Sequence, residues 1–105
     1  MDATSLDFDF SRLVPADRYK LLTSLVVPRP IALVTTISGT GVVNAAPISF
    51  FNVLGDDPPI LIISIEERDD GRIKDTSRNI ADSGEFVVNL VDEPIVERMH
   101  ACSHD

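Results

Sequence analysis

The chain has 105 residues, 44% of them hydrophobic, which suffices for one globular domain with a small core. Its 17 acidic residues outweigh nine lysines and arginines, and the formal net charge is −8 at pH 7. This balance argues against nucleic acid and anionic membrane surfaces as partners, because both attract clustered basic side chains, but it leaves room for a local pocket that binds one phosphate.

The N-terminal segment is polar and acidic with scattered apolar side chains, and we expect residues 1–14 to form an extended arm. A short helix is predicted over Asp17 to Leu25, because Tyr19, Leu22 and Leu25 lie near helical spacing. Pro28 then ends this helix, since proline cannot continue the helical hydrogen bonding.

The next segment predicts a β-hairpin. Residues Ile31 to Thr36, IALVTT, are rich in the β-branched side chains that favour strands. The turn SGTG follows, and a returning strand begins at Val42 and includes NAAPISFF. Pro47 in that strand lacks an N–H group, so we expect it at a sheet edge or a bulge.

A third strand and a charged loop are predicted after the hairpin. GDDPP, residues 55–59, is typical of a turn, and the continuous apolar run Ile60 to Ile65 predicts a strand buried on both faces. Residues 66–72, EERDDGR, are expected to form a loop. Three strands joined by short turns favour an antiparallel sheet.

Two helices and one strand are predicted in the last third of the chain. The first helix spans Thr76 to Ser83, with Asp75 or Thr76 as its cap and Gly84 at its end. A strand follows over residues 85–91, and a last helix begins near Glu93. No strand is predicted after it, so we expect the chain to be a fragment of a longer protein.

The first candidate site is a phosphate site in the sequence RDDGRIKDTSRN. A helix N-terminus offers N–H donors and a favourable dipole, and nearby cations supply the remaining attraction. The simpler interpretation is a solvated loop followed by an ordinary helix cap. The candidate residues are Arg68, Lys74, Asp75, Thr76 and Asn79.

The second candidate site is the stretch NAAPISFF itself. The small side chains of Ala45 and Ala46 allow a ligand to approach the backbone, and Phe50 and Phe51 supply apolar walls. Backbone N–H groups and the Ser and Asn side chains match the polar edge of a planar heteroaromatic ring. The simpler interpretation is a strand whose phenylalanines belong to the core.

The C-terminal sequence HACSHD contains metal-binding side chains, but we predict no metal site there. On a helix, His100 and His104 share a face while Cys102 points away from them. Cys102 also has no evident neighbouring base, so we expect no catalytic nucleophile. The spacing of Ile95, Met99 and Cys102 predicts a packing face instead.

The cellular location is predicted from absent signals. The single cysteine cannot form an intrachain disulfide, and no apolar run approaches the roughly 20 residues of a membrane span. The N-terminal MDATSLDFDF carries acidic residues where a signal peptide needs basic ones. We therefore interpret the protein as cytoplasmic, without membrane or nucleic acid partners.

Six segments in order resemble the flavin reductase-like family, which has the FMN-binding split-barrel fold. They extend from about Leu21 to Cys102 and comprise VPRPIALVTT, a glycine turn, VNAAPISFFNVL, DPPILIISI, DGRIKDTSRNI and GEFVVNLV. The resemblance implies a mainly β fold with short helices, a β-barrel of split-barrel type that is incomplete here, because family members are usually longer. It further implies an N-terminal arm over residues 1–20 and an FMN-binding domain over residues 21–105, truncated at its C-terminus.

The resemblance implies a function as well: an NAD(P)H:flavin reductase that binds flavin mononucleotide (FMN) and forms a homodimer. The flavin would carry the chemistry, so no catalytic side chain is expected. Two alternatives stay open, a non-catalytic flavin-binding or electron-carrier module and a structural dimerisation domain without cofactor. The match places the flavin ring and ribityl chain against Asn44, Ala46, Pro47, Ile48, Ser49 and Phe50, and the phosphate near Arg68, Lys74, Asp75 and Thr76, with Asn79 close by.

Overall fold

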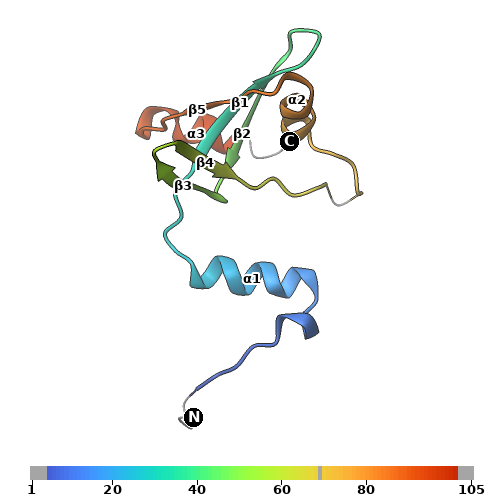
Figure 1. The fold of residues 1–105 in the computed structure, drawn as a ribbon, viewed down its shortest axis with the longest axis vertical. Coiled ribbons are helices and arrows are strands. Elements are labelled where there is room, and N and C mark those ends of the chain that lie inside the picture. The colour runs from blue at the N-terminus through green and yellow to red at the C-terminus, as the bar shows by residue number, and fades with distance from the viewer. Residues whose placement is uncertain (1–4, 69, 102–105) are drawn as a thin grey trace.

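The computed structural model describes residues 5–68 and 70–101, which form two small antiparallel sheets and short helices (Figure 1). One sheet has the strand order β2-β1-β5 and the other pairs β3 with β4. Both sheets are open, and no closed barrel exists among the described residues, which confirms the mainly β fold with an incomplete barrel. The elements are η1 (Phe10–Arg12), α1 (Pro15–Leu25), β1 (Ala32–Ile37), β2 (Val43–Ile48), β3 (Phe51–Asp56), β4 (Pro59–Ile63), α2 (Asp75–Ser83), β5 (Val87–Asn89) and α3 (Glu93–Ala101).

The predicted first hairpin is confirmed as β1 and β2. Its register runs from Ala32 opposite Ile48 to Ile37 opposite Val43. Pro47 lies in β2, which is an edge strand of its sheet, so its missing N–H group removes no hydrogen bond from a central ladder. The proline therefore sits where the sequence predicted it.

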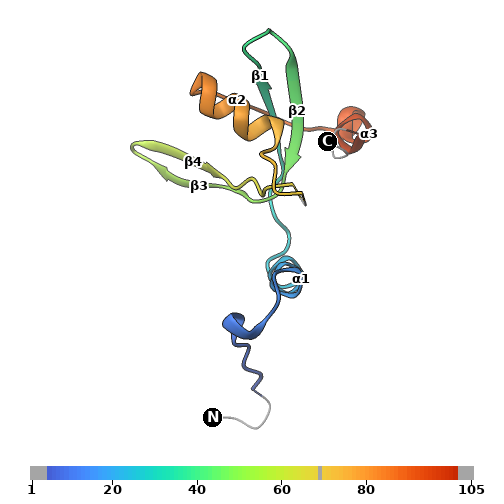
Figure 2. The same cartoon turned by 90° about the vertical axis from the view of Figure 1, so that its right-hand side faces the viewer.

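The stretch NAAPISFF is not one strand, which corrects the sequence prediction. β2 ends at Ile48, the chain bends at Ser49 and Phe50, and β3 begins at Phe51 in the second sheet. Phe51 packs against the buried cluster around Val34, so the bend returns the chain over the core. Figure 2 shows the resulting β3–β4 hairpin projecting away from the first sheet.

The run ILIISI is not buried on both faces, contrary to the prediction. In β4, Ile60 is 44% exposed and Leu61 and Ile62 are each 47% exposed. The physical reason is that β4 pairs with β3 alone and that the described residues place no layer over this two-stranded sheet. The strand also ends at Ile63, two residues earlier than predicted.

The core is small and lies elsewhere. Its buried apolar side chains are Ala32, Val34 and Ile48, with Phe51, Ile63, Ile65, Phe86 and Val88 packed partly buried around them. The radius of gyration is 16.7 Å, larger than the about 13 Å of a compact 100-residue domain. The described chain is thus extended, and much apolar surface remains uncovered within it.

The helices agree with the sequence except at their starts. α1 begins at Pro15, two residues before the predicted Asp17, because proline suits the first turn of a helix. α2 ends as predicted at Gly84, whose φ of 75° favours glycine. The predicted cap of α2 is wrong: Lys74 occupies the N-cap position and makes no side-chain cap bond.

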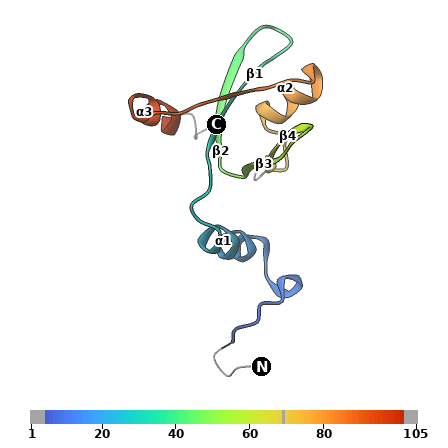
Figure 3. The same ribbon diagram turned by 60° about the vertical axis from the view of Figure 1, so that its left-hand side comes forward.

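Two of the helices lie beside the first sheet and one does not. Figures 2 and 3 show α2 and α3 on opposite sides of the β1–β2 hairpin, while α1 stands apart at the end of a connecting segment. The predicted strand over residues 85–91 is shorter, Val87–Asn89, and pairs with β1. None of the helices within residues 5–68 and 70–101 is long and apolar enough to span a membrane.

Candidate functional site

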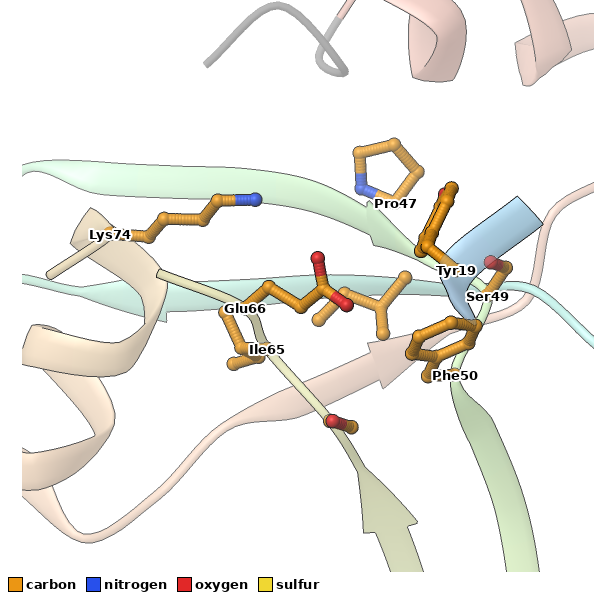
Figure 4. Close-up of a pocket in the computed structure, with 9 residues that line it drawn as sticks. Tyr19, Pro47, Ser49, Phe50, Ile65, Glu66 and Lys74 are labelled. Carbon is orange, nitrogen blue, oxygen red and sulfur yellow. The ribbon is translucent and has the colours of Figure 1, made fainter. Parts of the chain in front are cut away.

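A pocket of about 150 Å³ lies at the bend between the two sheets (Figure 4). Four parts of the chain meet there: α1, the end of β2 with the bend, the segment after β4, and the residue before α2. The backbone N–H of Ser64 donates to the carbonyl of Phe50 at 2.9 Å, which holds the segment after β4 beside the bend. The lining residues are Tyr19, Pro47, Ile48, Ser49, Phe50, Ser64, Ile65, Glu66 and Lys74.

The structure brings part of each predicted site together in this pocket. From the ring-binding stretch come the residues at and just before the bend, and from the phosphate loop comes Lys74. Lys74 and Glu66 both extend across the open space in Figure 4. Two segments that the sequence treated as separate candidates therefore form one site.

Three other predicted residues fix α2 to the hairpin instead of lining the pocket. Asn44 Nδ2 donates to Thr76 Oγ1 at 2.7 Å, and Asn79 Nδ2 donates to Thr36 Oγ1 at 3.0 Å. Thr76 and Asn79 are only 1% and 4% exposed, so these bonds are shielded from water. The bonds hold the first turn of α2 in place and thereby position Lys74 at the pocket.

The N-terminus of α2 is an anion-attracting end. Its N-cap, Lys74, makes no side-chain bond to the first-turn N–H groups. Those groups carry the positive end of the helix dipole, and the Lys74 ammonium adds a full charge beside them. Lys74 forms no salt bridge within residues 5–68 and 70–101, so a ligand anion need not displace one.

The remaining predicted residues lie outside this pocket. Asp75 forms an ion pair with Arg78 on the exposed side of α2. Arg68 is exposed in the loop, where its backbone N–H donates to the Arg72 carbonyl at 3.0 Å. Ala46, in β2, is half-buried and does not line the pocket.

Asp70 and Arg72 interact with each other in the loop before α2. Arg72 forms a salt bridge with Asp70 at 2.7 Å. Hydrogen bonds from the Arg72 backbone N–H and then from its guanidinium hold the pKa of the Asp70 carboxyl below its usual range. Asp70 therefore stays ionised at neutral pH, paired with Arg72.

Sequence reasoning missed several lining residues. Tyr19 comes from α1, and Ser64, Ile65 and Glu66 come from the segment after β4. No local sequence pattern distinguishes them, because their place in the pocket depends on the tertiary structure. Tyr19 depends on the position of α1, and the other three depend on the path of the chain after the β3–β4 hairpin. Glu66 had been assigned only to a charged loop.

The donor set suits a planar ligand with an anionic end. Aromatic and apolar side chains line one part of the pocket, and the charged side chains of Glu66 and Lys74 line another. Lys74 immediately precedes α2, so the N-terminus of that helix lies next to the pocket. The volume of about 150 Å³ is below the about 300–1,000 Å³ typical of complete ligand pockets. These residues thus fit FMN in kind, and the pocket that the described residues form has room for only a portion of such a ligand.

No metal-binding group is found at the described residues. Within 5–68 and 70–101 no three His, Cys, Asp or Glu side chains gather as metal ligands. Cys102 and His104 lie outside the described residues, as does the last member of the predicted Ile95–Met99–Cys102 face. Ile95 and Met99 are half-buried on α3, which contacts β2.

Comparisons with known proteins identify the family that the chain resembles. Residues 24–105 match the model of the flavin reductase like domain. An uncharacterised protein of Aquifex aeolicus is 57% identical over 81 residues, which are 77% of this chain and 41% of that protein.

Two solved structures resemble the chain closely. Nitrilotriacetate monooxygenase component B from Bacillus cereus is 39% identical with a TM-score of 0.86, over 96% of this chain and 50% of that one. The 2-nitrobenzoate 2-nitroreductase NbaA of Pseudomonas fluorescens is 45% identical with a TM-score of 0.83, over 95% and 48%. The chain therefore spans about half the length of the relatives that it matches.

Proposed function

Because the chain belongs to the flavin reductase-like family, we propose that it forms the FMN-binding part of an oxidoreductase that takes hydride from NAD(P)H. The observation that carries this proposal is that the bend after β2 and Lys74, which immediately precedes α2, line the same pocket. The proposed ring contacts and the proposed phosphate contact are therefore close enough for one nucleotide ligand. Two relatives that are at least 39% identical are a monooxygenase component and a nitroreductase, and both are redox proteins.

The phosphate end of the proposed site is Lys74 with the first turn of α2. The N–H groups of that turn donate to phosphate oxygens, and the ammonium of Lys74 neutralises part of their charge. The Asn44–Thr76 and Asn79–Thr36 bonds hold the helix where these donors converge. Arg68 and Asp75 remain predicted members of the phosphate site although neither lines the pocket, and Arg68 would have to fold back from its exposed loop to reach a phosphate.

The ring end of the proposed site is the bend. Pro47, Ile48, Ser49 and Phe50 line the pocket and would offer polar groups and an apolar wall to a flat ring. Asn44 and Ala46, which do not line the pocket, remain predicted ring contacts from the same stretch. Bound FMN supplies the hydride acceptor. The residues of this chain bind and orient it and exclude water, and no side chain is required as nucleophile or base.

We also propose that the complete protein is a homodimer in the cytoplasm. The exposed apolar side chains of β3 and β4 call for a covering layer, and a homodimer of the complete protein would supply part of it. We place this protein in the cytoplasm. NAD(P)H as the hydride donor, and the activity of the whole protein, belong to the same proposal, since this chain spans half of its relatives.

The test is a titration of the folded chain with FMN, followed by flavin absorbance and fluorescence. We expect saturable binding with a shifted flavin spectrum. Riboflavin, which lacks the phosphate, should bind more weakly, because Lys74 and the α2 N-terminus then lose their anion.

Addition of NADH or NADPH to the FMN complex separates the proposed functions. Loss of flavin absorbance at a rate above that of free FMN supports a reductase. A bound flavin that is not reduced faster than free FMN supports a non-catalytic flavin carrier. A folded chain with no measurable affinity for FMN contradicts the proposal as a whole.

A further inference from the structure

The N-terminal helix α1 meets the body of the protein at the ligand pocket. Figures 1 and 3 show α1 apart from both sheets, joined to them by a single connecting segment. Tyr19 of α1 nevertheless lines the pocket and is placed beside Phe50 in Figure 4. The ring centroids of Tyr19 and Phe50 are 6.0 Å apart and tilted by 51°, within the favourable range for aromatic pairs.

Arg29 fixes the end of α1 to the same phenylalanine. Its Nη1 donates to the carbonyls of Thr23 and Val26 at 2.8 Å each, where the helix ends. Its guanidinium carbon lies 5.8 Å from the centre of the Phe50 ring. A cation at a helix C-terminus and over an aromatic ring is favourable in both respects.

The Nε of Arg29 is buried beside these contacts. This atom has no hydrogen-bond partner among residues 5–68 and 70–101, which carries an energetic cost. The side chain keeps this orientation because the bonds to the two carbonyls and the contact with Phe50 offset that cost. Phe50 is therefore in contact with both Arg29 and Tyr19.

We propose that α1 is a wall of the flavin site, in which Tyr19 contacts the ring system of the ligand and Arg29 positions Tyr19. This inference rests on the proposed flavin binding and extends it to a helix that mostly precedes the family match, which begins at residue 24. Tyr19 is 48% exposed, so its ring has a free face to offer to a planar ligand. Its ring lines the pocket beside Phe50, so the two aromatic side chains together form one end of the pocket.

The experiment measures the affinity of the chain for both FMN and riboflavin, which share the ring. Tyr19→Ala should weaken both by about tenfold, because the lost contact is with the ring and not with the phosphate. Tyr19→Leu should retain part of the affinity through its apolar bulk. Leu25→Ala is the matched control, since Leu25 is 65% exposed on the same helix and does not line the pocket.

Fluorescence supplies a second readout, independent of turnover. A phenol in contact with an excited flavin quenches its emission by donating an electron. Tyr19→Phe should therefore leave both affinities close to wild type and raise the emission of the bound flavin. Circular dichroism checks that each variant retains its helix content.

Arg29 is tested as a positioning residue. Arg29→Ala should weaken FMN and riboflavin by a similar factor and raise the emission, because Tyr19 is then no longer held at the ring. In the presence of Tyr19→Ala, the same change should add little further loss, since both act through one contact.

Three results would overturn the inference. The first is wild-type affinity for both ligands in Tyr19→Ala, and the second is a loss confined to FMN, which would put Tyr19 at the phosphate. The third is unchanged emission in Tyr19→Phe. A wild-type chain that binds neither ligand would remove the proposed flavin binding itself, and this inference with it.

Discussion

Replacing Lys74 with alanine is expected to weaken FMN binding by about 10- to 100-fold. A charge-assisted hydrogen bond to a phosphate contributes about 1.5–3 kcal/mol, and 1.4 kcal/mol corresponds to a factor of ten. Lys74 lies in the pocket and forms no salt bridge among the described residues, so it loses no other ionic partner. The measurement is the dissociation constant from flavin fluorescence.

Riboflavin shows whether the loss belongs to the phosphate. Its affinity should be nearly the same for wild type and Lys74→Ala, because it carries no phosphate for the ammonium to contact. The free energy of unfolding should change by about 0.5 kcal/mol or less, since Lys74 makes no side-chain cap bond.

Lys20→Ala is the matched control, because it removes the same charge from α1 away from the pocket. It should leave the affinity for FMN unchanged. Equal loss of FMN and riboflavin affinity in Lys74→Ala, or an unchanged affinity for FMN, would remove Lys74 from the phosphate site.

Replacing Val34 with alanine is expected to lower the free energy of unfolding by about 2–3 kcal/mol. The side chain is 0% exposed in the central strand β1, and its loss removes two buried methyl groups and leaves a cavity. The core of the described chain has few buried side chains, so a cavity there is a large share of a typical stability of about 5–15 kcal/mol. Urea denaturation followed by circular dichroism measures the change.

Val43→Ala is the control for this prediction, because it makes the same change in the same sheet at a side chain that is 63% exposed. It should lower the free energy of unfolding by about 0.5 kcal/mol or less. Equal destabilisation by the two substitutions would mean that strand propensity, and not burial, determines the effect.

The elements that the sequence predicted well are those determined by neighbouring residues. The hairpin from Ile31 follows from β-branched strands around a glycine turn, and the end of α2 follows from Gly84. Both depend on backbone preferences that act over a few residues. The pairing of β1 with β5 could not be predicted from neighbouring residues, because the two strands are far apart in the sequence and pair at only three positions.

The features that the sequence could not supply depend on distant contacts. Thr76 was predicted as a helix cap, but its hydroxyl accepts a bond from Asn44, 32 residues earlier. The bend at Ser49 follows from the packing of Phe51 on the core. The hydrophobicity of ILIISI shows that these side chains favour burial, but not what lies above them.

The candidate site shows the same division. The resemblance to the family assigns Pro47, Ile48, Ser49 and Phe50 to the flavin ring and Lys74 to the phosphate, and all five residues line one pocket in the structure. The predicted contacts of all eleven residues with FMN stay predictions. Tyr19 was assigned only to a helical stripe, because its approach to Phe50 depends on where α1 docks.

The bend after β2 has a thermodynamic consequence. It joins two sheets through two residues, and the pocket touches both sides of that junction. A ligand that binds there contacts both sheets and so favours one angle between them. Its binding therefore stabilises the association of the two sheets. By linkage, a ligand at 100 times its dissociation constant adds about 2.7 kcal/mol to the unfolding free energy. Amide hydrogen exchange in the projecting β3–β4 hairpin would then slow with ligand concentration, although most of its residues never touch the ligand.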